Sequence, residues 1–345
     1  MLSYILKRIA LMVPTLLGVL TVTFIVIQFV PGGPVEQVLA EARASQKGGE
    51  GSAYKASRDI DKKQIEELKK LYGFDKPTHV RYVEMLVSFA KFDLGRSFMH
   101  NKDVWELIKE KLPVSISLGL WSFLLAYLVS VPLGVAKAVR EGSRFDTLTT
   151  LVVLIGYAIP GFVLGILLIV LFAGGTYLDW FPLRGLTSDN WEELAWPARI
   201  ADYFWHLALP LLCLTIGSFA VTTMLTKNTF VEEIRKQYVL VARAKGLSQQ
   251  RVLYKHIFRN ALIPLVTGFP AAVVGAFFTG ALLIETLFSL DGLGLLGYEA
   301  VIRRDYPVVL GSLYFFTLIG LVVKLISDLL YRVVDPRVQF GSVAK

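Results

Sequence analysis

The hydrophobic residues of this chain gather in six long stretches that contain no Asp, Glu, Lys or Arg. The stretches are Ile9–Val30, Leu112–Ala136, Thr147–Leu178, Tyr203–Thr226, Asn260–Ile284 and Tyr306–Val323. A helix needs roughly 20 apolar residues to cross the hydrocarbon core of a bilayer, whereas uncharged runs in soluble cores rarely exceed about 14. The pattern therefore predicts an all-α polytopic membrane protein with six transmembrane helices.

Two of these stretches carry further information. Thr147–Leu178 is longer than one span requires, so we expect part of it to leave the bilayer. Ile9–Val30 is too long for the apolar region of a signal peptide, and Pro31–Pro34 follows it instead of a small-residue cleavage site. Four prolines inside the stretches are candidate helix kinks, and they are Pro132, Pro160, Pro210 and Pro270.

The polar segment 31–113 separates the first two stretches. Residues 41–59 are small and polar, which is typical of a mobile loop. Two amphipathic helices are predicted after it. Their apolar positions are Ile65, Leu68 and Leu71, ended by Gly73, and then Tyr82, Met85, Leu86 and Phe89. We expect them to form a small cap on the outer membrane surface, either as a partner site or as a stabilising collar.

The second polar segment, 227–262, has helical patterning. Val231, Ile234, Tyr238 and Val241 are predicted to line one helix face. Gly246 lacks a side chain, so it suits the left-handed conformation that ends a helix. Ser248 is then placed to cap a second helix, which runs through Val252, His256 and Arg259.

Three interpretations of this segment were weighed. A DNA-reading helix-turn-helix conflicts with tethering to two membrane spans. A solvated basic loop explains the charge, but it leaves the small residues Ala242 and Ala244 unexplained. A docking element for a cytoplasmic partner explains both, because little bulk at Ala242 and Ala244 lets a partner surface approach the backbone.

Charge placement supports the membrane interpretation. The chain is 54% hydrophobic and carries a formal net charge of +8. The N-terminus, the segment after the second stretch, the loop 227–262 and the C-terminal tail together hold sixteen Lys and Arg residues, against four in the loops 179–202 and 291–305. By the positive-inside rule, both termini are predicted to be cytoplasmic. The excess of bases therefore indicates a membrane lipid environment and no nucleic-acid partner.

Candidate catalytic chemistry is missing from the sequence. Cys213 is the sole cysteine, which excludes an intrachain disulfide or a cysteine metal site, and the four histidines lack metal-ligand spacing. A Gly-x-x-x-x-Gly-Lys-Ser/Thr loop does not occur, so the chain is not predicted to cradle ATP phosphates in that way. We predict a non-enzymatic protein with no bound cofactor and no metal.

Eight ordered sequence blocks nevertheless resemble one family. The blocks are Pro14–Gly18, Pro31–Pro34, Leu71–Pro77, Asp93–Gly95 with Leu112–Pro113, Ala242–Leu247 with His256, Arg259–Ala261 and Pro264, Glu285–Ser289 with Gly292–Gly294, Arg304–Pro307, and Asp335–Arg337. They are similar to the dipeptide/oligopeptide branch of ATP-binding-cassette (ABC) importer permeases. The extra residues near 41–59 and Ser143–Asp146 most resemble the YejB-type permeases, which are linked to oligopeptides and microcin C.

The resemblance implies a fold, partners and a division of the chain. The fold would be that of a type I ABC importer permease. Partners would be a second homologous permease subunit, cytoplasmic ATPase subunits that bind ATP and Mg²⁺, and a periplasmic binding protein that delivers peptide at the inner membrane. The expected divisions are a first helix at 1–30, an extracytoplasmic segment at 31–113, a five-helix core at 114–335 with its coupling loop at about 227–262, and a tail at 336–345.

The resemblance also assigns candidate site residues. The family's coupling motif falls on Tyr238, Ala242, Arg243, Ala244, Lys245, Gly246, Leu247, His256, Arg259 and Asn260. The motif usually opens with Glu six residues before its glycine, and here Leu240 takes that place, while Val241 replaces the first alanine. A docking contact through that acid is therefore not expected.

Other candidate residues come from position and polarity. Glu285 with Arg303 or Arg304 is a candidate outer gate, with an ordinary interfacial charge cluster as the alternative. Weaker pathway candidates are Gln28, Ser122, Tyr127, Ser130 and Tyr157, and for each of them helix–helix packing is the favoured alternative. The alternative function is a proton-coupled secondary transporter, which would be expected to bury an acid near the middle of a span.

Overall fold

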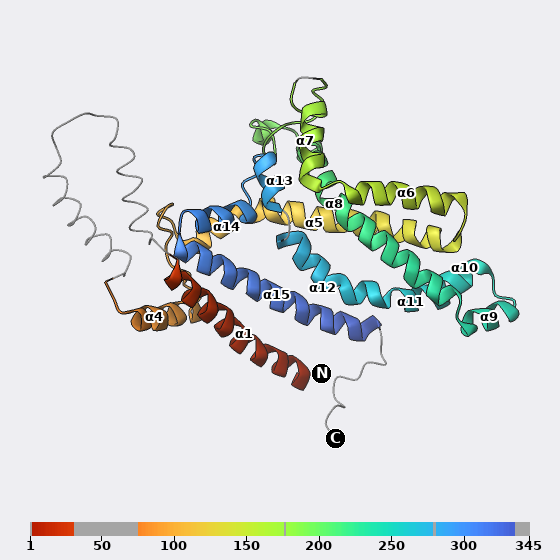
Figure 1. Ribbon diagram of the computed structural model, residues 1–345, viewed down its shortest axis with the longest axis horizontal. Coiled ribbons are helices and arrows are strands. Elements are labelled where there is room, and N and C mark those ends of the chain that lie inside the picture. Colours follow the sequence, from red (N-terminus) through yellow and green to blue (C-terminus); the bar gives the residue numbers. More distant parts are fainter. Residues whose placement is uncertain (1, 31–74, 176, 279–280, 335–345) are drawn as a thin grey trace. The chain divides into compact units, whose positions relative to one another are not determined.

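A computed structural model describes residues 2–30, 75–175, 177–278 and 281–334 (Figure 1). Helices dominate these ranges, and no strand occurs in them beyond one isolated bridge between Arg96 and Asp103. The helices are α1 (Leu2–Phe29), α4 (Thr78–Ala90), α5 (Val104–Val139), α6 (Arg144–Ala158), α7 (Gly161–Phe172), α8 (Trp196–Ile234), α9 (Gln237–Ala244), α10 (Gln249–Arg251), α11 (Phe258–Ala261), α12 (Ile263–Phe278), α13 (Ala281–Leu287), α14 (Leu293–Ile302) and α15 (Tyr306–Val334), with a 3-10 turn at Trp191–Glu193 and a π-helix at Val252–Ile257.

Four helices of the described residues are long and apolar enough to cross a membrane. Their spanning parts are Ser3–Phe29, Val104–Val139, Trp196–Ile234 and Tyr306–Leu329, and a bent pair formed by α6 and α7 makes a fifth candidate. The predicted stretch Asn260–Ile284 is divided among α11, α12 and α13, and its residues 279–280 lie outside the described ranges. The polytopic helical architecture is thus confirmed, and the number six stays a prediction.

The longest apolar stretch is bent where its sequence contains proline. α6 ends at Ala158 and α7 begins at Gly161, with an angle of 91° between them (Figure 1). Pro160 has no N–H to donate, and a proline restricts the preceding residue to extended backbone. Ile159 accordingly has ψ 117°. The candidate kink at Pro160 is therefore confirmed as a break between two helices.

The described residues divide into two compact units. The first contains those of residues 1–5, 112–295 and 320–345, and the second those of residues 6–111 and 296–319. In the second unit, α4 presents one apolar face, as its spacing predicts. Tyr82, Met85 and Leu86 are half-buried and Phe89 is buried, with its ring 5.3 Å from that of Tyr314. The first predicted cap helix and residues 41–59 lie outside the described residues.

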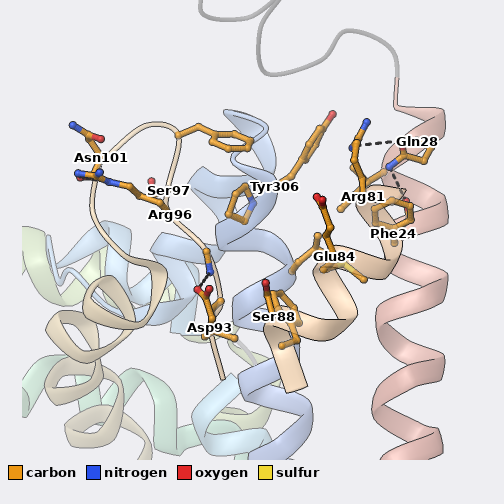
Figure 2. Close-up of a pocket in the computed structure, with 18 residues that line it drawn as sticks. Phe24, Gln28, Arg81, Glu84, Ser88, Asp93, Arg96, Ser97, Asn101 and Tyr306 are labelled. Carbon is orange, nitrogen blue, oxygen red and sulfur yellow. Dashed lines mark hydrogen bonds between the residues drawn. The ribbon is translucent and has the colours of Figure 1, made fainter. Parts of the chain in front are cut away.

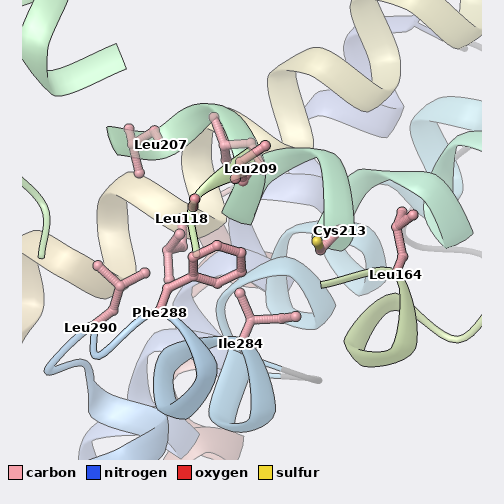
Figure 3. Close-up of a cluster of buried hydrophobic side chains, with 10 residues drawn as sticks. Leu118, Leu164, Leu207, Leu209, Cys213, Ile284, Phe288 and Leu290 are labelled. Carbon is pink, nitrogen blue, oxygen red and sulfur yellow. The ribbon is translucent and has the colours of Figure 1, made fainter. Parts of the chain in front are cut away.

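The first unit is built around α8. α6 and α7 pack against it, and α13 packs against both α7 and α8. A buried cluster of aliphatic and aromatic side chains from α5, α7, α8, α13 and the segments that follow α7 and α13 packs in the first unit (Figure 3). Its labelled members are Leu118, Leu164, Leu207, Leu209, Cys213, Ile284, Phe288 and Leu290. Van der Waals packing of these side chains holds the helices together, because lipid tails are as apolar as the side chains and burial away from them gives no hydrophobic driving force.

Candidate functional site

The segment after α8 contains a short helix separated from α8 by two residues. α8 ends at Ile234, and Lys236 adopts an extended conformation with ψ 150° before α9 begins at Gln237. The predicted single face through Val231, Ile234, Tyr238 and Val241 is therefore wrong in part. The break resets the helical phase, so that Val239 rather than Val241 points into the core, and Val241 is 53% exposed.

The end of α9 forms a Schellman motif. Gly246 has φ +77°, its N–H donates to Arg243 O at 2.9 Å, and the N–H of Leu247 donates to Ala242 O at 3.3 Å. These two bonds satisfy carbonyls that the helix end leaves open. Ser248 then accepts from the N–H of Arg251 and caps α10. The left-handed glycine and the serine cap are both confirmed.

α9 is supported by a second buried cluster of the first unit. Val239 and Ala242 pack there with Val135 and Ala138 of α5, Phe230 of α8, and Val252, Ile257 and Ala261 of the following helices. Ala242 is only 7% exposed. Its small side chain therefore serves packing inside this chain, and the expectation that it leaves space for a partner is wrong. Ala244, by contrast, is exposed.

The outward surface of the loop is partly apolar. Leu240 is 59% exposed, and Val241 lies beside it on α9. Tyr254 of the π-helix is also exposed. Arg243, Lys245 and Arg259 are exposed bases of the same segment. Leu240 and Val241, which are adjacent, exposed and followed by two exposed bases, are therefore a candidate protein interaction surface.

A hydrogen-bond network joins α8, α9 and α11. The Tyr238 hydroxyl donates to Glu233 Oε2 at 2.6 Å, and Asn260 Nδ2 lies 3.4 Å from Tyr238 Oη. The same Asn260 nitrogen lies 3.5 Å from the His256 carbonyl oxygen. Burial and the bond to Glu233 raise the pKa of Tyr238 to about 12. Three of the residues that the motif assigned, Tyr238, His256 and Asn260, are thus brought together.

The sequence interpretation did not identify Glu233, which accepts the hydrogen bond of Tyr238 in this network. Glu233 is buried, and its other oxygen pairs with Lys236. Together these contacts fix the angle between α8 and α9. A sequence signal did exist, because Glu233 is one of two acids in a segment otherwise rich in bases.

A buried ion cluster lies at the same end of the first unit. Lys137 of α5 is fully buried, and its Nζ lies 3.1 Å from Asp146 Oδ1 and donates to Thr149 Oγ1 and Thr150 Oγ1 at 2.9 and 2.6 Å. Lys227 of α8 contacts Asp146 Oδ2 at 2.7 Å. Asp146 therefore ties α5, α6 and α8 together. Sequence spacing gives no sign of it, because the charges come from separate helices.

Glu285 is fully buried in the first unit. Its Oε2 accepts from the N–H of Leu295 at 2.7 Å, within the first turn of α14. A carboxylate at this position satisfies open N–H groups and complements the helix dipole. Arg303 is exposed and Arg304 is half-buried with φ +55°. The pairing of Glu285 with either arginine stays a prediction.

The five pathway candidates occupy different environments. Ser122 and Ser130 are buried and donate to the carbonyls of Gly119 and Phe219 at 3.1 and 3.0 Å, as helix-packing residues do. The ring centres of Tyr127 and Phe123 lie 4.6 Å apart with the rings tilted, and Tyr157 is exposed. Gln28 lines a pocket in the second unit. No geometry among the described residues joins these five into one site.

Comparison with known proteins bears on what this arrangement does. Residues 130–340 match the family model described as "Binding-protein-dependent transport system inner membrane component". The chain is 53% identical to the "Peptidoglycan transport system permease protein YejB" of Agrobacterium fabrum, over 98% of both chains. It is 51% identical to the "Inner membrane ABC transporter permease protein YejB" of Escherichia coli O157:H7, covering 98% of this chain and 99% of that protein.

More distant relatives agree with this assignment. The "Oligopeptide transport system permease protein AppB" of Bacillus subtilis is 33% identical over 99% of this chain and all of that protein. A solved inward-facing structure of the MetNI methionine ABC transporter matches 67% of this chain and 97% of its own chain, with a TM-score of 0.51 at 18% identity, which supports the type I importer fold. This chain therefore belongs to the family of binding-protein-dependent transport system inner membrane components, and it is a multi-pass permease subunit of the inner membrane.

Proposed function

We propose that this chain forms half of the translocation pathway of an ATP-driven peptide importer. Its relatives are named for peptidoglycan, oligopeptide and di- or tripeptide transport, which supports a peptide-like substrate. The cargo class proposed is short peptides, including microcin C-like peptides. The observation that carries the proposal is the exposed apolar surface of α9, a short helix whose opposite side packs on the second buried cluster.

The ATPase partner is proposed to dock on this outward surface. Leu240 and Val241 supply exposed apolar anchors, and Arg243 and Lys245 lie at the rim, where charges steer association more than they add affinity. Closure of partner subunits around ATP and Mg²⁺ would push α9. The Tyr238–Glu233 bond and the second cluster connect that push to α8, so α8 would move with it as a rigid element.

Orientation and span number form part of the proposal. Six spans with cytoplasmic termini are supported by the asymmetry of Lys and Arg between alternate loops. Cysteine placed at Gln249 should be shielded from an impermeant thiol reagent added outside, whereas cysteine at Ser52 should react. Background labelling should be low, since Cys213 is buried. The reversed labelling pattern would contradict this topology.

A second permease subunit is proposed to complete the pathway, and an external binding protein to deliver peptide. Six helices make a narrow bundle for a peptide, which supports the need for a partner. Full peptide uptake by membranes that contain this chain without a second permease would contradict this part of the proposal.

The energy source separates the proposed importer from a proton-coupled secondary transporter. Vesicles with the complete system should take up peptide when ATP is supplied and ionophores have collapsed the proton gradient. Uptake that needs the gradient and ignores ATP would overturn the proposal and favour the secondary transporter. A vesicle preparation without the binding protein serves as the control.

A further inference from the structure

The second unit contains a pocket of about 650 Å³ that the proposed coupling mechanism does not use. Its walls come from the end of α1, from α4, from the loop at residues 93–101 and from the start of α15 (Figure 2). The volume lies in the usual range for small-ligand sites. Two of the sequence blocks noted above, Asp93–Gly95 and Arg304–Pro307, contribute to this one place.

A buried carboxylate fixes the wall formed by the loop. Asp305 is 2% exposed, and it accepts from the hydroxyl of Ser97 and from the N–H groups of Phe98 and Met99 at 3.1 and 3.2 Å. A carboxylate with three donors is a strong anchor. The loop is therefore held in one conformation, with Arg96 at the pocket.

Two guanidinium groups stand on opposite sides of the pocket (Figure 2). Arg96 donates through Nε and Nη2 to the carbonyl of Asn101 at 3.0 and 2.7 Å, and these bonds use only two of its five N–H groups. Arg81 lies 6.0 Å from the centre of the Phe24 ring, with Nη2 3.5 Å from Gln28 Oε1. Burial lowers the pKa of Arg81, as expected for a cation that has lost water.

Negative groups lie between the arginines. The carboxylates of Glu84 and Asp93 line the same pocket (Figure 2), and Glu84 also contacts Lys76 at 2.6 Å. Apolar side chains complete the lining, among them Phe24, Ile27 and Leu310. The pocket therefore presents cationic, anionic and apolar surfaces within one small volume, which a zwitterionic ligand with an apolar side chain would match.

We infer that this pocket binds a short peptide by its free termini, with the carboxylate on Arg81 and Arg96 and the ammonium group facing Glu84 and Asp93. A side chain of the peptide would lie against Phe24, Ile27 and Leu310. This inference rests on the proposed function, because it names a contact site for the same class of substrate. In the proposed topology, α4 and the loop 93–101 lie outside the membrane, so the pocket would hold the peptide before it crosses.

The test measures peptide binding to the permease pair in nanodiscs, without the binding protein. The probes are the tripeptide Ala-Phe-Ala with a free carboxyl end and the same peptide with an amidated end. Amidation should weaken binding about tenfold or more, since it removes a charge-assisted pair. In Arg81→Gln or Arg96→Gln, amidation should weaken peptide binding much less, because the arginine that pairs with the carboxylate has been removed. Lys91→Gln is the matched control, an exposed base outside the pocket lining.

The amino end gives an independent arm. Acetylation of the tripeptide should weaken binding in the wild type and have little further effect in Glu84→Gln. If an arginine variant does not fold, a photoreactive diazirine on the peptide still locates its binding site on the wild-type protein. Its cross-links should map to α4 and the loop 93–101. Cross-links elsewhere would overturn the inference, as would equal amidation penalties in the wild type and both arginine variants.

Uptake by the complete importer separates this inference from the proposed function. Suppose the wild-type system takes up Ala-Phe-Ala, but amidation and acetylation weaken binding as much in the pocket variants as in the wild type. The inference is then wrong and the importer function stands. If the system transports no peptide with ATP present, the proposed function fails. Loss of binding-protein association in the variants, with peptide binding unchanged, would identify a protein docking surface and overturn the inference.

Discussion

The hydroxyl of Tyr238 donates a hydrogen bond to Glu233 Oε2 across 2.6 Å. This bond joins α9 to the last turn of α8. Only two residues, Arg235 and Lys236, link the two helices along the chain. A hydrogen bond to a charged acceptor is stronger than a neutral one. In the proposed mechanism, this pair would transmit movement of α9 to α8.

Replacing Tyr238 by Phe should loosen this connection. The change removes the donor and keeps the ring, so we expect a loss of about 1 kcal/mol of stability. ATPase activity should then become less tightly coupled to peptide uptake. The ratio of ATP hydrolysed to peptide transported, measured in reconstituted vesicles, should rise. An unchanged ratio would show that the bond is structural only.

The same pair predicts a pH dependence. The pKa of Tyr238 is raised to about 12, above the usual value of 10.0. A raised pKa means that the protonated form is favoured in the folded state, so its contribution is fully present below about pH 10 and is lost as pH approaches 12. The ultraviolet difference titration of wild type minus Tyr238→Phe should show one tyrosine ionising late. A difference centred near pH 10 would contradict this.

Gly246→Val should uncouple the loop. The residue has φ +77°, and a branched side chain resists that region by roughly 1–2 kcal/mol. The variant should insert in the membrane but lose ATPase association and peptide uptake. Gly246→Asn is the matched control, because asparagine tolerates this conformation and should retain most activity. Equal behaviour of both variants would remove the conformational explanation.

Leu240 and Val241 should matter for partner affinity and hardly for folding. Replacing both with Ser removes exposed apolar anchors, and the ATPase should bind roughly tenfold more weakly or worse. Gln250→Ser, at another exposed position of the loop, should have no such effect. Ala242→Leu should instead overfill the second cluster, lowering the unfolding temperature together with association. Co-purification and thermal unfolding distinguish the two outcomes.

The ion cluster should respond asymmetrically to substitution. Asp146→Asn leaves Lys137 and Lys227 without their shared carboxylate, and such a loss costs about 3–5 kcal/mol in a buried setting. Lys137→Met should cost less, because Asp146 keeps Lys227. The double variant should be more stable than the sum of the single effects predicts. Unfolding temperatures of the purified protein measure all three, and simple additivity would contradict the coupling.

Gly292 should resist even a methyl group. A Cβ there would lie 2.4 Å from Glu285 Oε1, and Glu285 is fully buried, so it has little room to move. Gly292→Ala should destabilise the protein by about 1–3 kcal/mol. Gly297→Ala is the control, since nothing lies within 4 Å of its added atom. In a Glu285→Ala background, the methyl at Gly292 should cost little.

Much of this protein follows from the sequence alone. Apolar runs near 20 residues have few alternatives to membrane helices, because backbone groups in lipid must be satisfied within the helix. Local rules likewise placed the break at Pro160, the left-handed turn at Gly246, the cap at Ser248 and the apolar face of α4. Each of these depends on residues within a few positions of one another.

The tertiary structure decided which side of each helix is used. Ala242 looked like an open surface and is buried, because the phase of α9 is set by the extended Lys236 and by packing against α5 and α8. Asp146 meets Lys137 and Lys227 only once three helices have assembled. Contacts between residues far apart in sequence depend on folded geometry, and one-dimensional spacing carries no record of that geometry.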